Sequence, residues 1–102
     1  MPRAEYRLSP KAIRDLNSIW TYVSEHNEPA ADALLHRIRD RIRSAAIYPE
    51  IGAKRPRLGA QARILIEGSY VVVYEPADYG VHVVTIVHAR RRPSHWLKDK
   101  NS

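Results

Sequence analysis

The chain has 102 residues, of which 44% are hydrophobic and 27% charged, so residues 1–102 are expected to form one globular domain with a modest core. It has no cysteine, which excludes disulfides and thiolate zinc sites, and no apolar run long enough for a signal peptide or a membrane span, so we expect a cytoplasmic protein. The net charge of +6 is concentrated in residues 35–63, with eight basic and two acidic side chains, and in residues 85–102, with five and one, which favours an anionic partner.

The N-terminal region predicts a short strand and a helix. Residues 4–8 form the strand, and Ser9 and Pro10 are residue types preferred at the N-cap and the first position of a helix. The helix is predicted to end near His26 and Asn27, because asparagine favours a stop with positive φ. Its apolar stripe recurs at helical spacing and consists of Ile13, Leu16, Ile19, Trp20 and Val23.

A second helix is predicted to begin at Glu28 and Pro29 and to end at Tyr48, because Pro49 disfavours a helical conformation in the residue before it. The two or three residues between the helices predict an antiparallel helical hairpin. The apolar stripe of the second helix consists of Ala30, Leu34, Ile38, Ile42 and Ala45.

Residues 49–62, PEIGAKRPRLGAQA, predict a basic loop, because they contain two prolines, two glycines and no periodicity. Ile51 and Leu58 are the expected anchors of this loop in the core. The last part of the chain, residues 93–97, predicts a single helical turn whose Trp96 packs back, and residues 97–102 are expected to be a frayed tail.

Three apolar runs, residues 63–67, 70–75 and 81–88, predict a three-strand antiparallel meander, because Val, Ile, Tyr and Thr dominate the runs while Gly, Pro and Asp fill the gaps. Gly68 and Ser69 fit a two-residue hairpin turn. Strict alternation along the third run would place His82 and His88 on one face.

The predicted fold class is therefore α+β, in the order β-α-α-β-β-β, with the hairpin on one face of a four-strand, mainly antiparallel sheet. The expected core consists of Leu16, Trp20, Leu34, Ile38, Ile42 and either Ile64 or Leu65.

This order of elements resembles the RelE/ParE superfamily of toxins from bacterial type II toxin–antitoxin modules, and its ParE branch most. The matching segments are LSPKAIRDLNSIWTYV, AADALLHRIRDRI, YPEIG, RILIEGSYVVVYEP and VHVVTIVHARRRP. The resemblance rests on the combination of these segments in this order and at this length. The resemblance implies a toxin that inhibits growth through DNA gyrase and assembles with a cognate acidic antitoxin in a hetero-oligomer.

The RelE-like branch of the superfamily instead cleaves mRNA on the ribosome. In that branch an arginine commonly follows the aromatic residue of the middle strand and precedes a tyrosine by three residues. Here Val71 occupies that place between Tyr70 and Tyr74, and a valine cannot stabilise the charge of a phosphorane. This departure counts against nuclease activity.

The enzyme question stays open at this point, with a non-enzymatic toxin favoured. If the protein were a metal-free nuclease, His88 would be the candidate base, and Arg63, Arg57 or Arg90 would bind the phosphate. We expect no cofactor and no metal, because the histidines lack HxH or HExxH spacing. His88 is also a reasonable strand-end residue bonded to the nearby backbone.

A third alternative is a basic nucleic-acid-binding module without toxin activity. Under the favoured interpretation, the basic clusters are candidates for contact with the antitoxin or the target. These partner-binding candidates are Arg37, Arg41, Lys54, Arg55, Arg57, Arg90, Arg91 and Arg92.

Overall fold

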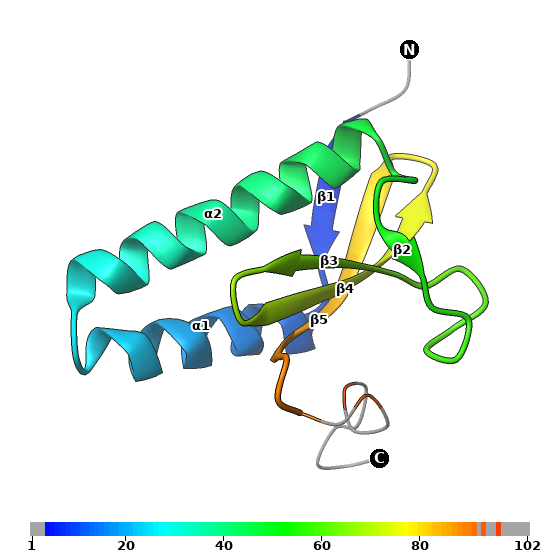
Figure 1. Cartoon of the computed structure of the whole chain (residues 1–102). Helices are drawn as coiled ribbons and strands as arrows, with labels where there is room; N and C mark the ends of the chain where they lie inside the picture. Colours follow the sequence, from blue (N-terminus) through cyan, green and yellow to red (C-terminus); the bar gives the residue numbers. More distant parts are fainter. Residues whose placement is uncertain (1–3, 92, 94–95, 97–102) are drawn as a thin grey trace.

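The computed structural model describes residues 4–91, 93 and 96, and it confirms an α+β fold (Figure 1). Arg92 and the tail expected at residues 97–102 lie outside the described residues. Neither helix is long and apolar enough to cross a membrane, in the part of the chain that the structure describes. The elements are β1 (Glu5–Leu8), α1 (Pro10–Ser24), α2 (Glu28–Ile47), β2 (Ala53–Lys54), β3 (Arg63–Glu67), β4 (Tyr70–Ala77) and β5 (Gly80–His88).

The sheet has five strands in the order β1-β5-β4-β3-β2, not the four that we expected. The additional strand is β2, whose two residues pair antiparallel with Ile64 and Arg63 inside the segment predicted to be a loop. So short a strand has no periodicity that a sequence could reveal. The sheet is mixed, because β1 runs parallel to β5 while the other pairs are antiparallel.

Capping residues set the helix boundaries. The Ser9 side chain accepts a hydrogen bond from the backbone N–H of Ala12 at 2.9 Å, as predicted for an N-cap. The expected role of Asn27 is wrong: its φ is −165°, and its side chain accepts the N–H of Ala30, so it begins α2 instead of ending α1 with a positive φ. The helix α1 already ends at Ser24.

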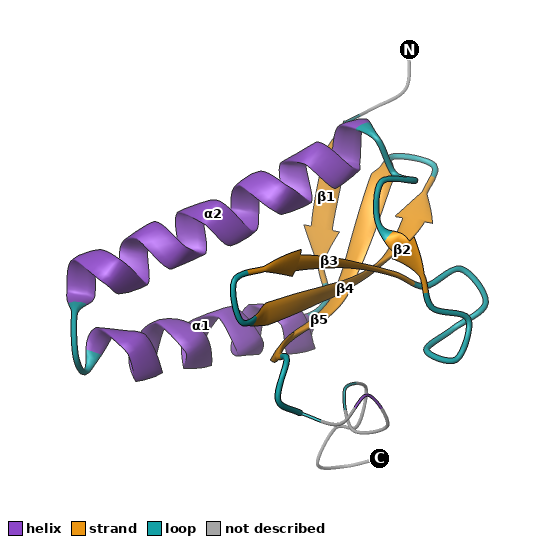
Figure 2. Ribbon diagram, viewed as in Figure 1, coloured by secondary structure: helices purple, strands orange, loops and turns teal. Residues whose placement is uncertain are grey.

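The helices cover one face of the sheet, as expected (Figure 2). Trp20 is the exception within the predicted core, because it is only partly buried: its indole N–H donates to Asp32 Oδ1 at 2.8 Å, linking α1 to α2. The core on this face includes Ala12, Leu16, Ile19, Leu34, Ile38, Ile42, Leu65, Val72, Tyr74, Val81, Val83 and Ile86.

A second apolar cluster lies on the opposite face of the sheet. Trp96 covers it, as predicted, and its indole N–H donates to the carbonyl of Arg91 at 2.9 Å. Leu58 packs against this cluster, but the other expected loop anchor, Ile51, is 46% exposed. The side chains of Arg63 and Tyr74 instead hold the chain around Ile51 through hydrogen bonds to its backbone. The buried members of the cluster are Ile64, Val71, Val73, Val87 and Trp96.

The pairing of β4 with β5 is irregular: Tyr74 faces Val83 and Val73 faces Thr85, so Val84 is an extra residue in β5. The extra residue reverses the alternation, because Val83 and Ile86 both lie on the helix-covered face. The prediction that His82 and His88 share a face is therefore wrong. His88 follows Ile86 onto the helix-covered face, and His82 shares the parity of Val84 on the other face.

Truncating Ile38 to alanine tests the docking of the hairpin. Ile38 is fully buried between the helices and the sheet, so Ile38→Ala should lower the free energy of unfolding by about 2–5 kcal/mol. Ile13→Ala on α1, where the side chain is 49% exposed, is the control and should change it far less. Urea unfolding of both variants measures the difference, and equal effects would mean that α2 does not pack as described.

Candidate functional site

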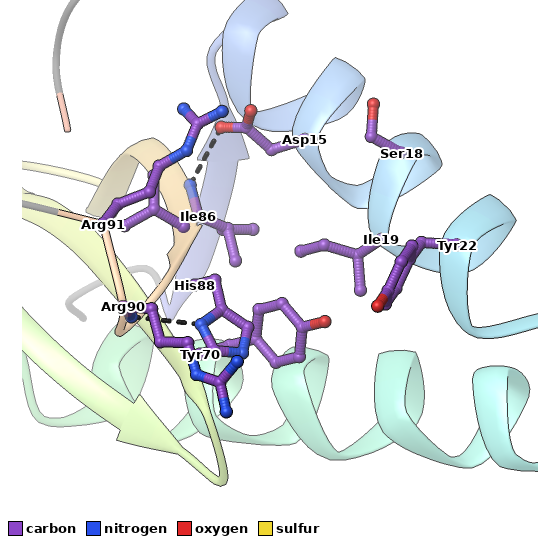
Figure 3. A pocket seen from close by; sticks show the side chains of 10 residues that line it. Asp15, Ser18, Ile19, Tyr22, Tyr70, Ile86, His88, Arg90 and Arg91 are labelled. Atoms are coloured by element: carbon purple, nitrogen blue, oxygen red, sulfur yellow. Dashed lines mark hydrogen bonds between the residues drawn. The ribbon is translucent and has the colours of Figure 1, made fainter. Parts of the chain in front are cut away.

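A pocket of about 540 Å³ opens between α1 and the adjoining ends of β4 and β5 (Figure 3). Its walls combine tyrosine rings, aliphatic side chains and two arginines from the end of β5. The lining residues are Asp15, Ser18, Ile19, Tyr22, Tyr70, Ile86, Val87, His88, Arg90 and Arg91.

Asp15 fixes α1 against β5 beside this pocket. Its carboxylate accepts the hydroxyl of Thr85 at 2.5 Å and the backbone N–H of Ile86 at 3.0 Å. Lys11, one helical turn earlier, pairs with the same carboxylate at 3.2 Å and donates to the Thr85 hydroxyl at 2.7 Å. The pairing of β1 with β5 ends at Val83. Beyond that point the backbone N–H of Ile86 in β5 donates to the Asp15 side chain of α1 instead of to a neighbouring strand.

His88 is held by two neighbours. Its Nδ1 accepts the backbone N–H of Arg90 at 3.0 Å, and its ring packs edge-on against Tyr70 with centroids 5.2 Å apart. A neutral imidazole whose Nδ1 is an acceptor carries its proton on Nε2. Burial raises the pKa of Tyr70, and the proximity of Tyr22 adds to the effect, so the Tyr70 hydroxyl stays protonated and can donate at neutral pH.

Arg63 lies elsewhere and is occupied. Its guanidinium donates to the carbonyls of Glu50 at 2.9 Å and Gly52 at 2.8 Å. The buried Tyr74 hydroxyl reinforces this clamp, because it accepts the N–H of Gly52 at 2.9 Å and donates to the carbonyl of Pro49 at 2.7 Å. A side chain at Gly52 would collide with that hydroxyl, since an added Cβ would lie 2.6 Å from it.

The structure does not bring Arg63 together with His88. In the strand register, Arg63 lies opposite Tyr74 of β4 and His88 lies opposite Tyr70 of β4. The positions of Arg63 and His88 are therefore four residues apart along the sheet, roughly 13 Å at ~3.3 Å per residue. Arg90 does lie in the pocket with His88. Among the residues that the structure describes, no three His, Asp or Glu side chains form a group that could hold a metal ion.

Comparison with known proteins gives the family. The family model described as "ParE toxin of type II toxin-antitoxin system, parDE" matches residues 6–93, which is most of the chain. The protein belongs to the ParE toxin family. It is therefore a toxin of a type II toxin–antitoxin system, and membership of this family implies a cognate antitoxin as its partner.

Three relatives of this ParE-family toxin cover most of its length. Toxin RelE2 of Caulobacter vibrioides is 33% identical over 79% of this chain and 90% of its own. Toxin ParE1 of the same organism is 34% identical over 81% of this chain and 86% of its own. The putative toxin Y4kP of Sinorhizobium fredii is 25% identical over 90% of this chain and 95% of its own. The chain is 33% identical to toxin RelE2 and 34% identical to toxin ParE1, so sequence identity does not favour one branch over the other.

The basic candidates of the ParE-family toxin fall into separate groups. Arg37 and Arg41 lie on α2, where Arg37 pairs with Glu67 of β3 at 3.3 Å. Lys54, Arg55 and Arg57 are exposed in and after β2. Arg90 and Arg91 are exposed at the end of β5 and line the pocket, while Arg92 lies outside the described residues.

Sequence reasoning missed three residues that shape the pocket: Asp15, Tyr22 and Tyr70. Asp15 and Tyr22 fall outside the apolar stripe of α1, and Tyr70 stands out in the sequence only as a strand residue and as the aromatic residue before Val71. Only the i, i+4 spacing of Lys11 and Asp15 offered a signal, and such pairs are usually solvent-exposed helix contacts.

Replacing the Asp15 carboxylate tests whether it anchors α1. Asp15→Asn keeps the size of the side chain but removes the charge facing Lys11 and one of the acceptor oxygens, so the free energy of unfolding should fall by about 1–3 kcal/mol. Asp40→Asn on α2 is the matched control, because within the described part of the chain the Asp40 side chain contacts only the exposed His36 and Arg43. A loss of similar size in both variants in chemical denaturation would contradict the anchoring role.

Proposed function

We propose that this ParE-family toxin inhibits growth by acting on DNA gyrase rather than by cutting RNA. The observation that carries the proposal is the residue at position 71. Val71 stands where RelE-like toxins commonly have an arginine, and it is buried with Val73, Val87 and Trp96 on the face away from the helices. An aliphatic side chain packed in this way offers no charge to a phosphate in a transition state.

The other candidate groups for RNA cleavage support the same proposal. The Arg63 guanidinium donates hydrogen bonds to the carbonyls of Glu50 and Gly52 and so holds the turn after α2. The Nδ1 of His88 is engaged by the backbone of Arg90. A metal-free nuclease needs a base, a cationic phosphate site and an acid gathered around one phosphate. Arg63 and His88 are too far apart to act on the same phosphate.

A ribosome-dependent mRNA endonuclease is the alternative function. One feature favours it: His88, Tyr70, Arg90 and Arg91 line a single pocket, where an imidazole and two guanidinium groups could meet an RNA phosphate. The likeness to a relative named toxin RelE2 points the same way.

Two assays with the purified toxin separate these functions. We expect inhibition of DNA supercoiling by gyrase and no cleavage of mRNA on the ribosome. His88→Ala should leave growth inhibition largely intact, because the proposed action does not use the imidazole as a base, and a thermal melt checks that the variant folds. A wild type that cleaves mRNA on ribosomes, together with a His88→Ala variant that does not, would establish the alternative.

We further propose that the acidic antitoxin binds along the edge of the sheet formed by β3 and β2. Because β2 pairs only with Arg63 and Ile64, it leaves residues 65–67 of β3 as an open edge, where Ile66 is 57% exposed. Arg37 lies beside this edge through its pair with Glu67, and Lys54 extends the basic surface from β2. Exposed ion pairs contribute only about 0–1 kcal/mol each, so apolar burial should provide most of the affinity.

Charge should then govern how fast the antitoxin binds. Reversing both charges in Arg55→Glu/Arg57→Glu should slow association and weaken its dependence on salt, with a smaller effect on dissociation. Arg39→Glu/Arg43→Glu is the charge-matched control, because at about 100° per residue these side chains lie on the other side of α2 from Arg37 and Arg41. Binding kinetics at low and moderate salt measure the effect. An association rate that neither substitution pair nor salt alters would place the antitoxin elsewhere.

A further inference from the structure

We propose that the pocket between α1 and the ends of β4 and β5 binds a nucleotide: a planar base with its phosphate, either free or at the end of a nucleic acid strand. This inference concerns binding alone. It does not depend on gyrase being the target, because the pocket is defined by its own walls.

The size and the aromatic walls of the pocket suit a base. A volume of about 540 Å³ lies within the ~300–1,000 Å³ typical of small-molecule sites. Ile19 from α1 and Ile86 from β5 give it apolar surface (Figure 3). The rings of Tyr22, Tyr70 and His88 complete the walls, and Tyr22 is 67% exposed, so its ring is accessible to a stacking partner.

The charges of the pocket suit a phosphate. Arg90 and Arg91 are exposed at its rim, and neither takes part in an ion pair with a carboxylate among the described residues. The acidic residue in the lining, Asp15, is compensated, because Lys11 pairs with it and Thr85 donates to it. The guanidinium groups therefore leave the pocket net positive, and arginine pairs with phosphate oxygens in a bidentate manner.

The hydrogen-bonding groups of the pocket agree with an anion. The protonated hydroxyl of Tyr70 and the hydroxyl of Ser18 can donate, and His88 presents its Nε2–H because its Nδ1 is occupied. An acidic peptide could use the two arginines, but it would leave most of the three-ring surface without a planar partner. A nucleotide satisfies the aromatic and the cationic parts of the pocket together.

Calorimetric titration of the full-length toxin tests the proposal with four probes: AMP, adenosine, inorganic phosphate, and a short 5′-phosphorylated oligodeoxyadenosine. AMP should bind at least tenfold more tightly than adenosine or phosphate alone, because only AMP reaches both parts of the pocket. An oligonucleotide that binds more tightly than AMP identifies a strand end as the ligand, whereas equal affinities identify the free nucleotide.

Three variants place the binding in this pocket. Arg91→Gln should weaken AMP at least tenfold while leaving adenosine unchanged, and Tyr22→Ala should weaken AMP and adenosine alike. Arg39→Gln on α2 removes the same charge away from the pocket and should change neither. Failure of AMP and the oligonucleotide to bind at millimolar concentration overturns the proposal. It is equally overturned if Arg39→Gln weakens AMP as much as Arg91→Gln, or if an acidic peptide binds where AMP does not.

Discussion

The arrangement of helices and sheet depends on the hydrogen bonds that the Asp15 carboxylate of α1 accepts from β5. The parallel pairing of β1 with β5 ends at Val83, and there the chain turns through Ser9 directly into α1. The Ser9 hydroxyl donates to the carbonyl of Val84, and Asp15 then takes the next donors along the strand, the hydroxyl of Thr85 and the N–H of Ile86. Beyond the end of β1, a side chain of the helix thus takes the place of a paired strand and gives the Thr85 hydroxyl and the Ile86 N–H an acceptor.

A second set of contacts fixes the C-terminal end of α2. The Tyr74 hydroxyl donates to Pro49 and accepts from Gly52, and Arg63 binds two carbonyls of the same turn. Burial raises the pKa of Tyr74, which keeps this hydroxyl in the neutral form that can donate one hydrogen bond and accept another. Since the turn follows directly from α2, Tyr74 and Arg63 place the C-terminal end of α2 while Asp15 places α1.

Local signals in the sequence were sufficient for the helix starts, the meander and most of the core, because caps and hydrophobic periodicity act over a few residues. The role of Trp20, the bulge at Val84 and the strand β2 were not predictable in this way. The bulge depends on how β4 and β5 pair, and that single extra residue moves His88 to the face opposite His82. The pocket could not be found either, because Asp15, Tyr22 and Tyr70 come together only when α1 docks on the sheet.

The order of the strands separates the surfaces that this toxin can use. The part of β3 that β2 leaves uncovered lies beside basic side chains of α2 and β2, whereas the aromatic pocket lies at the ends of β4 and β5. The backbones of β3 and β5 are ~10 Å apart across the sheet, with β4 between them, and Tyr70 of β4 both lines the pocket and pairs with Glu67 of β3. A partner lying along β3 would not need to fill the pocket, and a ligand in the pocket would not need to touch β2. A small domain can therefore present two basic surfaces with different chemistry. The edge of β3 can form backbone hydrogen bonds with a partner strand, and the aromatic rings of the pocket can stack on a planar ligand.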